Sequence, residues 1–129
     1  MKVMIITNNS NVAKDFAENN QMEYLEEKTY LDVLYLARDL IHKNHTLLTH
    51  PLSGSIKPNE TPFKSLALSL EAKEFDMQSL EIIENAIATT EKLLNDCKVR
   101  EWPERIINDF KLIDYNLISS GIESINQFN

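Results

Sequence analysis

The sequence predicts an α/β domain in three layers, with a short, mostly parallel four-stranded sheet, helices on both faces and a helical C-terminal third. Two observations predict this class: short apolar runs alternate with segments of helical period in the first half, and only helical periods follow residue 76. The chain has 129 residues, enough for one hydrophobic core without a metal or a disulfide. We therefore expect residues 1–129 to form a single domain.

Four segments predict strands. Residues 3–7, Val-Met-Ile-Ile-Thr, form an apolar run that ends in a polar Asn-Asn-Ser turn, as a buried parallel strand does. Residues 22–25 and 46–49 predict two further short strands, and Pro51 would end the second of these. Residues 65–70 predict the fourth. Its direction relative to the third stays open, because the thirteen residues between them are just enough for a crossover.

Two segments in the first half predict helices. Residues 11–19 predict a short one. Thr29 and Asp32 have the spacing of a capping box in which the aspartate replaces the usual glutamate. Apolar residues then recur at helical intervals through residue 42, so this second helix should cover the sheet with one apolar face.

The C-terminal third predicts two longer helices. Asp76 has the character of an N-cap, and an apolar stripe follows it to about residue 97. Trp102 and Pro103 open the last helix, since proline is tolerated in a first turn. Gly121 is a natural residue to end it.

Charge, termini and cysteine content argue against several classes of protein. The net charge of −7 argues against nonspecific nucleic-acid binding, which needs a broad basic surface, and against an anionic membrane surface. The apolar run at the amino terminus is too short for a signal peptide or a membrane span. The one cysteine, Cys97, cannot form an intramolecular disulfide, which fits a cytoplasmic location.

Residues 42–65 differ from the rest of the chain. They contain all three histidines, three of the four prolines and one of the two glycines. Three lysines and one glutamate give this segment a charge of about +2 in an acidic protein. Turn formers, hydroxyls, amides and lysines are the groups that an anion site uses. A loop this long in a compact domain is more often functional than idle.

Ligands of open α/β sheets bind beyond the carboxyl ends of the strands, so the polar turn after the first strand and the loop after the third should meet at one edge. There we expect a phosphate, a carboxylate or a sulfur oxyanion. The hydroxyls of Ser53 and Ser55, the Gly54 backbone and Lys57 would contact it. Asn8 and Asn9 would bind the rest of the ligand, and Lys64 would add charge. Asn59 and Glu60 would cap loop backbone groups, and the carboxylate of Glu60 would orient a lysine or a histidine. The predicted ligand-binding residues are Asn8, Asn9, His50, Ser53, Gly54, Ser55, Lys57, Asn59, Glu60 and Lys64.

Other interpretations of the loop are weaker. It matches neither a Walker A loop nor a Rossmann fingerprint. His45 and His50 lack further ligands for a metal, so neither a metal nor a cofactor is expected. A hydrolase triad of His50, Ser53 or Ser55, and Glu60 lacks the usual motifs. His50 as an acid or base of another reaction is the one catalytic candidate, and a binding protein is favoured over an enzyme. The alternative to a binding site is a purely structural one, in which the loop is a tight turn with solvated lysines.

The stretch from His50 to Ser65, His-Pro-Leu-Ser-Gly-Ser-Ile-Lys-Pro-Asn-Glu-Thr-Pro-Phe-Lys-Ser, resembles a segment of the GrdX family. Ile-Ile-Thr-Asn-Asn near the amino terminus, Leu-Leu-Thr-His before the stretch, and residues 109–114, Asp-Phe-Lys-Leu-Ile-Asp, are similar too. These small bacterial proteins are encoded beside glycine reductase components in amino-acid-fermenting anaerobes. The resemblance implies an accessory role with a small carboxylate or an acyl phosphate as ligand. The alternative is an adaptor without a small ligand, which docks on a reductase subunit with this loop as its contact surface. The family offers no catalytic residues to transfer, and without a Cys-x-x-Cys motif this chain is not itself the redox component.

Overall fold

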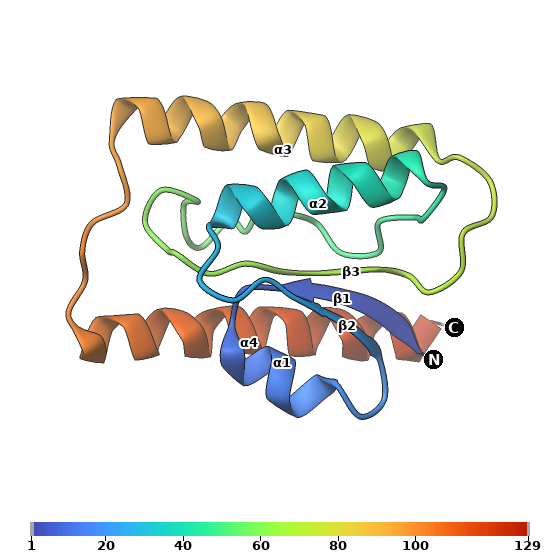
Figure 1. The fold of residues 1–129 in the computed structure, drawn as a ribbon, viewed down its shortest axis with the longest axis horizontal. Coiled ribbons are helices and arrows are strands. Elements are labelled where there is room, and N and C mark those ends of the chain that lie inside the picture. Colours follow the sequence, from blue (N-terminus) through green and yellow to red (C-terminus); the bar gives the residue numbers. More distant parts are fainter. Residues whose placement is uncertain (1, 129) are drawn as a thin grey trace.

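The structure, a computed structural model, describes residues 2–128. Its three-stranded mixed sheet has the order β2-β1-β3, in which β1 is parallel to β2 and antiparallel to β3. Four helices accompany the sheet, and the last two form the C-terminal part of the chain (Figure 1). The elements are β1 (Val3–Thr7), α1 (Ser10–Phe16), β2 (Gln21–Tyr24), α2 (Tyr30–His42), β3 (Ser65–Ser69), α3 (Met77–Asp96) and α4 (Glu104–Phe128).

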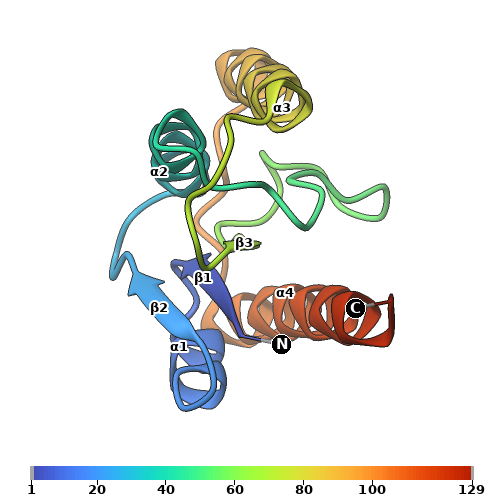
Figure 2. The same ribbon diagram turned by 90° about the vertical axis from the view of Figure 1, so that its right-hand side faces the viewer.

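The central strand β1 is buried on both faces, as its apolar run predicts. Ile6 packs with Leu66 and Leu68 of β3 on the face covered by α2, against which α3 packs. Val3 and Ile5 belong to the core on the opposite face, beneath α1 and α4. Figure 2 shows helices on both sides of the sheet, so the predicted three layers are present.

The prediction of a four-stranded, mostly parallel sheet was wrong. Residues 46–49 make only one isolated bridge, in which Leu47 pairs antiparallel with Leu68. The ladder does not extend because hydroxyl groups accept from two of its backbone donors. The Thr49 hydroxyl accepts from the backbone N–H of Ala67 at 3.0 Å, and the Ser69 hydroxyl accepts from the N–H of Thr46 at 2.8 Å. The segment therefore runs beside β3 without becoming a strand.

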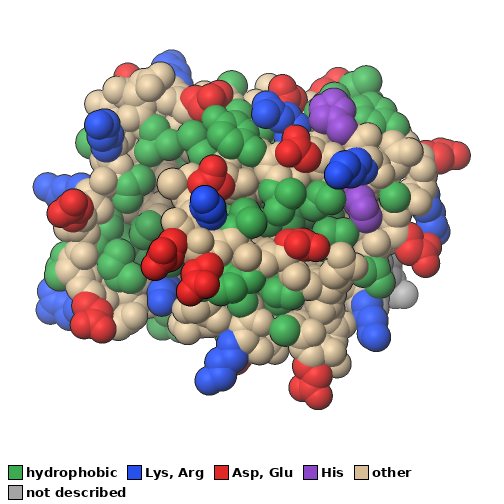
Figure 3. All heavy atoms as spheres, viewed as in Figure 1, with side chains coloured by type: hydrophobic (Ala, Val, Ile, Leu, Met, Phe, Trp, Pro, Cys, Tyr) green, Lys and Arg blue, Asp and Glu red, His purple; other side chains and the backbone are tan. Residues whose placement is uncertain are grey.

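The predicted helix starts are confirmed by hydrogen bonds. In α2 the Thr29 N–H donates to the Asp32 carboxylate at 2.9 Å, and the Asp32 N–H donates to the Thr29 hydroxyl at 3.1 Å, which completes the capping box. Asp76 caps α3 by accepting from the Ser79 N–H at 3.2 Å. No helix within residues 2–128 combines the length and apolarity needed to cross a bilayer. On the face shown in Figure 3, acidic and basic side chains are interspersed, and no continuous basic area covers it.

Gly121 does not end the last helix, contrary to the prediction, because α4 continues to Phe128. Its role lies in packing. A Cβ at this position would stand 3.0 Å from Cγ2 of Thr49. Glycine therefore lets the irregular segment 46–49 approach the middle of α4 closely.

Replacing Gly121 by alanine should destabilise the protein, although alanine is the better helix former by about 1 kcal/mol. Overpacking of this kind costs roughly 1–3 kcal/mol, because the β-branched Thr49 has little freedom to move aside. Thr49→Ser removes the obstructing methyl group but keeps the hydroxyl that accepts from Ala67. In that background Gly121→Ala should be neutral or stabilising. Urea unfolding of the four proteins in a double-mutant cycle measures this coupling, and equal effects of Gly121→Ala in both backgrounds would contradict it.

Candidate functional site

The end of β1 and the start of β3 meet at one edge of the sheet, where Thr7 pairs with Ser65. Asp114 of α4 is buried beside them, with 5% of its surface exposed. Its carboxylate accepts from the Ser65 N–H at 2.9 Å, from the Ser65 hydroxyl at 2.7 Å and from the Asn9 amide at 3.0 Å. One side chain thus joins β1, β3 and α4.

The direction of the remaining hydrogen bonds follows from this carboxylate. Because Ser65 gives its only hydroxyl hydrogen to Asp114, Thr7 must donate in the 2.6 Å contact between the Thr7 and Ser65 hydroxyls. Thr7 in turn accepts from the Asn9 N–H at 2.9 Å. We call these four residues, Thr7, Asn9, Ser65 and Asp114, the Asp114 cluster.

Lys64, next to this cluster, is a buried lysine. Only 6% of the residue is exposed, and Nζ lies 5.7 Å from the centroid of the Tyr30 ring. Among the described residues its ammonium group makes no hydrogen bond or ion pair. Burial lowers the pKa of Lys64, while the charge of Asp114 acts in the opposite direction. A buried cation without a direct partner is rare and costly.

For the two neighbouring groups that are neutral when protonated, Asp114 and Tyr30, burial raises the pKa. For Asp114, desolvation raises the pKa above its usual range, although the hydrogen bonds from Ser65 and Asn9 and the charge of Lys64 oppose it. For Tyr30, burial raises the pKa, and the charge of Asp114 adds to the effect. The Tyr30 hydroxyl is therefore a permanent donor, and it donates to the Pro51 carbonyl at 3.0 Å.

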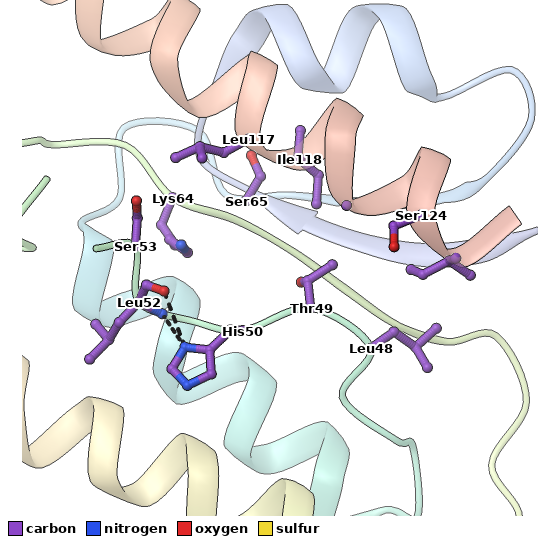
Figure 4. Close-up of a pocket in the computed structure, with 12 residues that line it drawn as sticks. Leu48, Thr49, His50, Leu52, Ser53, Lys64, Ser65, Leu117, Ile118 and Ser124 are labelled. Atoms are coloured by element: carbon purple, nitrogen blue, oxygen red, sulfur yellow. Dashed lines mark hydrogen bonds between the residues drawn. The ribbon is translucent and has the colours of Figure 1, made fainter. Parts of the chain in front are cut away.

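A pocket of about 430 Å³ opens between the long loop, the start of β3 and α4. In Figure 4 the Lys64 side chain extends into the space between the loop and α4. The lining residues are Leu48, Thr49, His50, Leu52, Ser53, Lys64, Ser65, Leu117, Ile118, Gly121, Ser124 and Ile125.

Three donors lie around this pocket. The Lys64 ammonium is the first. The Thr49 hydroxyl accepts from Ala67 and keeps its own hydrogen. The Ser53 hydroxyl accepts from the Ser55 N–H at 3.2 Å and lies 2.8 Å from the Ser55 hydroxyl. With Ser55 as the donor in that contact, Ser53 also keeps its hydrogen. Donors of this kind, one of them charged, suit an anion.

Three of the ten predicted ligand-binding residues, His50, Ser53 and Lys64, line this pocket. The ring of His50 is turned to the backbone of its own loop, as Figure 4 shows. Its Nδ1 lies 3.1 Å from both the N–H and the carbonyl oxygen of Leu52, so this nitrogen accepts from the first in one tautomer and donates to the second in the other.

Asn8 and Asn9 lie close to the pocket but use their amides to build it. Both hydrogens of the Asn8 amide are donated, to the carbonyls of Lys28 at 2.9 Å and Pro62 at 2.8 Å, and its oxygen accepts from the Lys64 N–H. The Asn9 amide donates to the Lys111 carbonyl at 3.0 Å and to Asp114. Neither side chain has a donor left for a ligand.

The other predicted residues lie outside the pocket lining. Gly54, Ser55 and Lys57 form an exposed turn. Glu60 caps this turn, since its carboxylate accepts from the Lys57 N–H at 3.3 Å. Asn59 fastens the loop to α3 by donating to the carbonyls of residues 93 and 97, and the Trp102 indole donates to the carbonyl of residue 60 at 2.9 Å.

The hydrogen bonds do not assemble the triad considered for this loop. Within the described residues, His50 makes no hydrogen bond to Ser53, Ser55 or Glu60. His45 is held by the Ser69 carbonyl at 2.9 Å. Residues 2–128 contain no group of three or more His, Cys, Asp or Glu side chains placed to hold a metal.

Sequence reasoning missed Asp114 as part of this site. The signal was present in the helical pattern: an acidic residue stands in the apolar stripe of α4, four residues after Phe110 and four before Ile118. A charged residue in a buried stripe needs partners. Those partners come from β1 and β3, which are remote in sequence.

Replacing Asp114 by asparagine should destabilise the fold by about 1–3 kcal/mol, because the amide turns a donor toward the Ser65 and Asn9 donors. The loss should depend on pH. Since burial raises the pKa of Asp114, the native state binds its proton more tightly than the unfolded chain, so stability falls as pH rises from about 4 through the raised pKa. The difference in stability between the wild type and Asp114→Asn should therefore be largest at acid pH. Chemical unfolding of both proteins at several pH values measures this, and a penalty that grew toward neutral pH would contradict the raised pKa.

Comparison with known proteins agrees with the resemblance noted in the sequence. No curated protein and no solved structure matches the chain. A protein-family model described as GrdX-like protein matches residues 4–123, which include nearly all of β1, the long loop and the Asp114 cluster. This protein therefore belongs to the GrdX-like protein family.

Proposed function

We propose that this protein binds a small anionic metabolite, a carboxylate or an acyl phosphate, in the pocket beside Lys64, and acts as an accessory protein of glycine reductase metabolism in the cytoplasm. The observation that carries the proposal is Lys64, of which only 6% is exposed and whose ammonium group has no direct partner among the described residues. A buried charge is costly unless it is paired. A bound anion would supply the missing partner.

The pocket suits such a ligand in size and in donors. Its volume of about 430 Å³ is within the roughly 300–1,000 Å³ of small-molecule sites. Thr49 and Ser53 contribute hydroxyl groups to the lining that contains the Lys64 cation. Asp114 is not a direct partner of Lys64: its carboxylate accepts three hydrogen bonds from Ser65 and Asn9, and no hydrogen bond or ion pair joins it to the ammonium.

Lys64→Met should abolish the stabilisation that the wild type gains from anions. Methionine keeps the aliphatic packing but removes the charge, so affinity should fall by about 1.5–3 kcal/mol, the value of a charge-assisted hydrogen bond. Without ligand, the variant should be as stable as the wild type or more so, because a buried charge is gone. Thermal shift with acetate, glycine, sarcosine, betaine and acetyl phosphate measures both effects.

Lys57→Met is the matched control, since Lys57 lies on the exposed turn of the same loop. It should leave anion binding nearly unchanged. If Lys57→Met removed the effect and Lys64→Met did not, the anion would sit on the outer turn. If no anion stabilised the wild type, the proposed function would be wrong.

Anion binding should also weaken as pH rises. Burial lowers the pKa of Lys64, so its ammonium loses the proton at a lower pH than an exposed lysine, and the neutral amine no longer attracts an anion. We expect the Kd for acetate to increase between neutral pH and about pH 10, the ordinary range just below a lysine pKa. Titration calorimetry over this range measures it, and a constant Kd would contradict the role of Lys64.

The second candidate function is an adaptor that docks on a reductase subunit. Exposed apolar side chains on α4 favour it: Leu112 is 57% exposed, and Ile113 and Leu117 are about two-fifths exposed. Co-purification with reductase subunits that is lost in Leu112→Asp and indifferent to Lys64→Met would favour docking over metabolite binding.

A further inference from the structure

We infer that the ligand is a monoanion with an apolar tail, a carboxylate on a hydrocarbon chain that lies along α4. This inference rests on the proposed function and specifies the chemical class of the ligand. The pocket lining divides into two parts. Lys64 and Ser53 lie at one end, whereas the rest of the wall is formed mainly by aliphatic side chains and a glycine, with the hydroxyls of Thr49 and Ser124 among them.

The apolar part follows one face of α4. The residues of α4 that line the pocket are 117, 118, 121, 124 and 125, a spacing that places them on the same side of the helix over two turns. Seven residues from the first of these to Ser124 correspond to about 10 Å along the helix axis. In Figure 4, Lys64 and Ser53 lie at one end of this stretch, and Leu48 and Ser124 lie at the other.

Gly121 brings α4 against the segment 46–49 in the middle of this stretch. A Cβ there would stand 3.0 Å from Cγ2 of Thr49, so the two residues are in contact and no ligand passes between them. Together they form part of the pocket wall, along which an unbranched chain would lie.

Charge restricts the ligand further. Apart from His50, Lys64 is the one ionisable residue among those that line the pocket. The far end offers only the Ser124 hydroxyl, so a second anionic group or a sugar would find no charged partner there. Leu117, with 40% of its surface exposed, borders the pocket and would be covered by an apolar chain.

A chain-length series tests the tail. Titration calorimetry with acetate, butyrate, hexanoate and octanoate should show Kd falling about threefold for each added methylene, which corresponds to somewhat less than the ~0.8 kcal/mol of a buried CH₂, until the pocket is full. Octanol and octylamine carry the same tail without the anion and should bind much more weakly than octanoate. Adipate, with a second carboxylate at the far end, should bind more weakly than hexanoate.

A matched pair of variants locates the tail. Ser124→Phe fills the far end of the pocket and should remove the gain from longer chains, so that octanoate binds no more tightly than acetate to this variant. Glu123→Phe adds the same side chain at a neighbouring exposed position that does not line the pocket, and should keep the full chain-length dependence.

The outcomes separate this inference from the proposed function. Binding of acetate and acetyl phosphate with no gain from chain length would overturn the tail and leave the anion site intact. Octanol binding as tightly as octanoate, with no effect of Lys64→Met, would overturn the anionic head and with it the proposed function. No binding by any member of the series would overturn both.

Discussion

The buried carboxylate of Asp114 fixes the positions of the elements from which the site is made. It draws Ser65 at the start of β3 and Asn9 after β1 onto α4, through three hydrogen bonds in a region closed to water. Hydrogen bonds to a charge in such surroundings are strong, and leaving any of these donors unpaired would be costly. The position of α4, which forms one wall of the pocket, is therefore determined by a polar contact as well as by apolar packing.

The same carboxylate explains why Lys64 remains available. Asp114 and Lys64 lie close enough for each charge to influence the pKa of the other, yet no ion pair joins them. The donors from Ser65 and Asn9 occupy the carboxylate oxygens. Asp114 thus offsets part of the cost of burying the ammonium group without using its hydrogens, an arrangement that suits a binding site better than a neutralised pair.

What the sequence predicts and what it misses follow the range of the interactions. The apolar run of β1 and the capping box at Thr29 depend on neighbouring residues, and both were predicted correctly. The ladder beside β3 is interrupted by hydroxyls of Thr49 and Ser69, and Gly121 is needed because Thr49 packs against it. These contacts join remote segments, and no local pattern reveals them. For the site, the loop and Lys64 could be found from composition, whereas the acid that organises them could not.

The loop that covers the pocket is fastened along its length despite its prolines and its glycine. Tyr30 holds its start through Pro51, Asn59 ties its middle to the end of α3, and Asn8 holds its end through Pro62. Only the short serine-glycine turn between these anchors lacks such a tether among the described residues. A loop that is already held in place loses little conformational entropy when a ligand binds, so even weak contacts would count toward affinity.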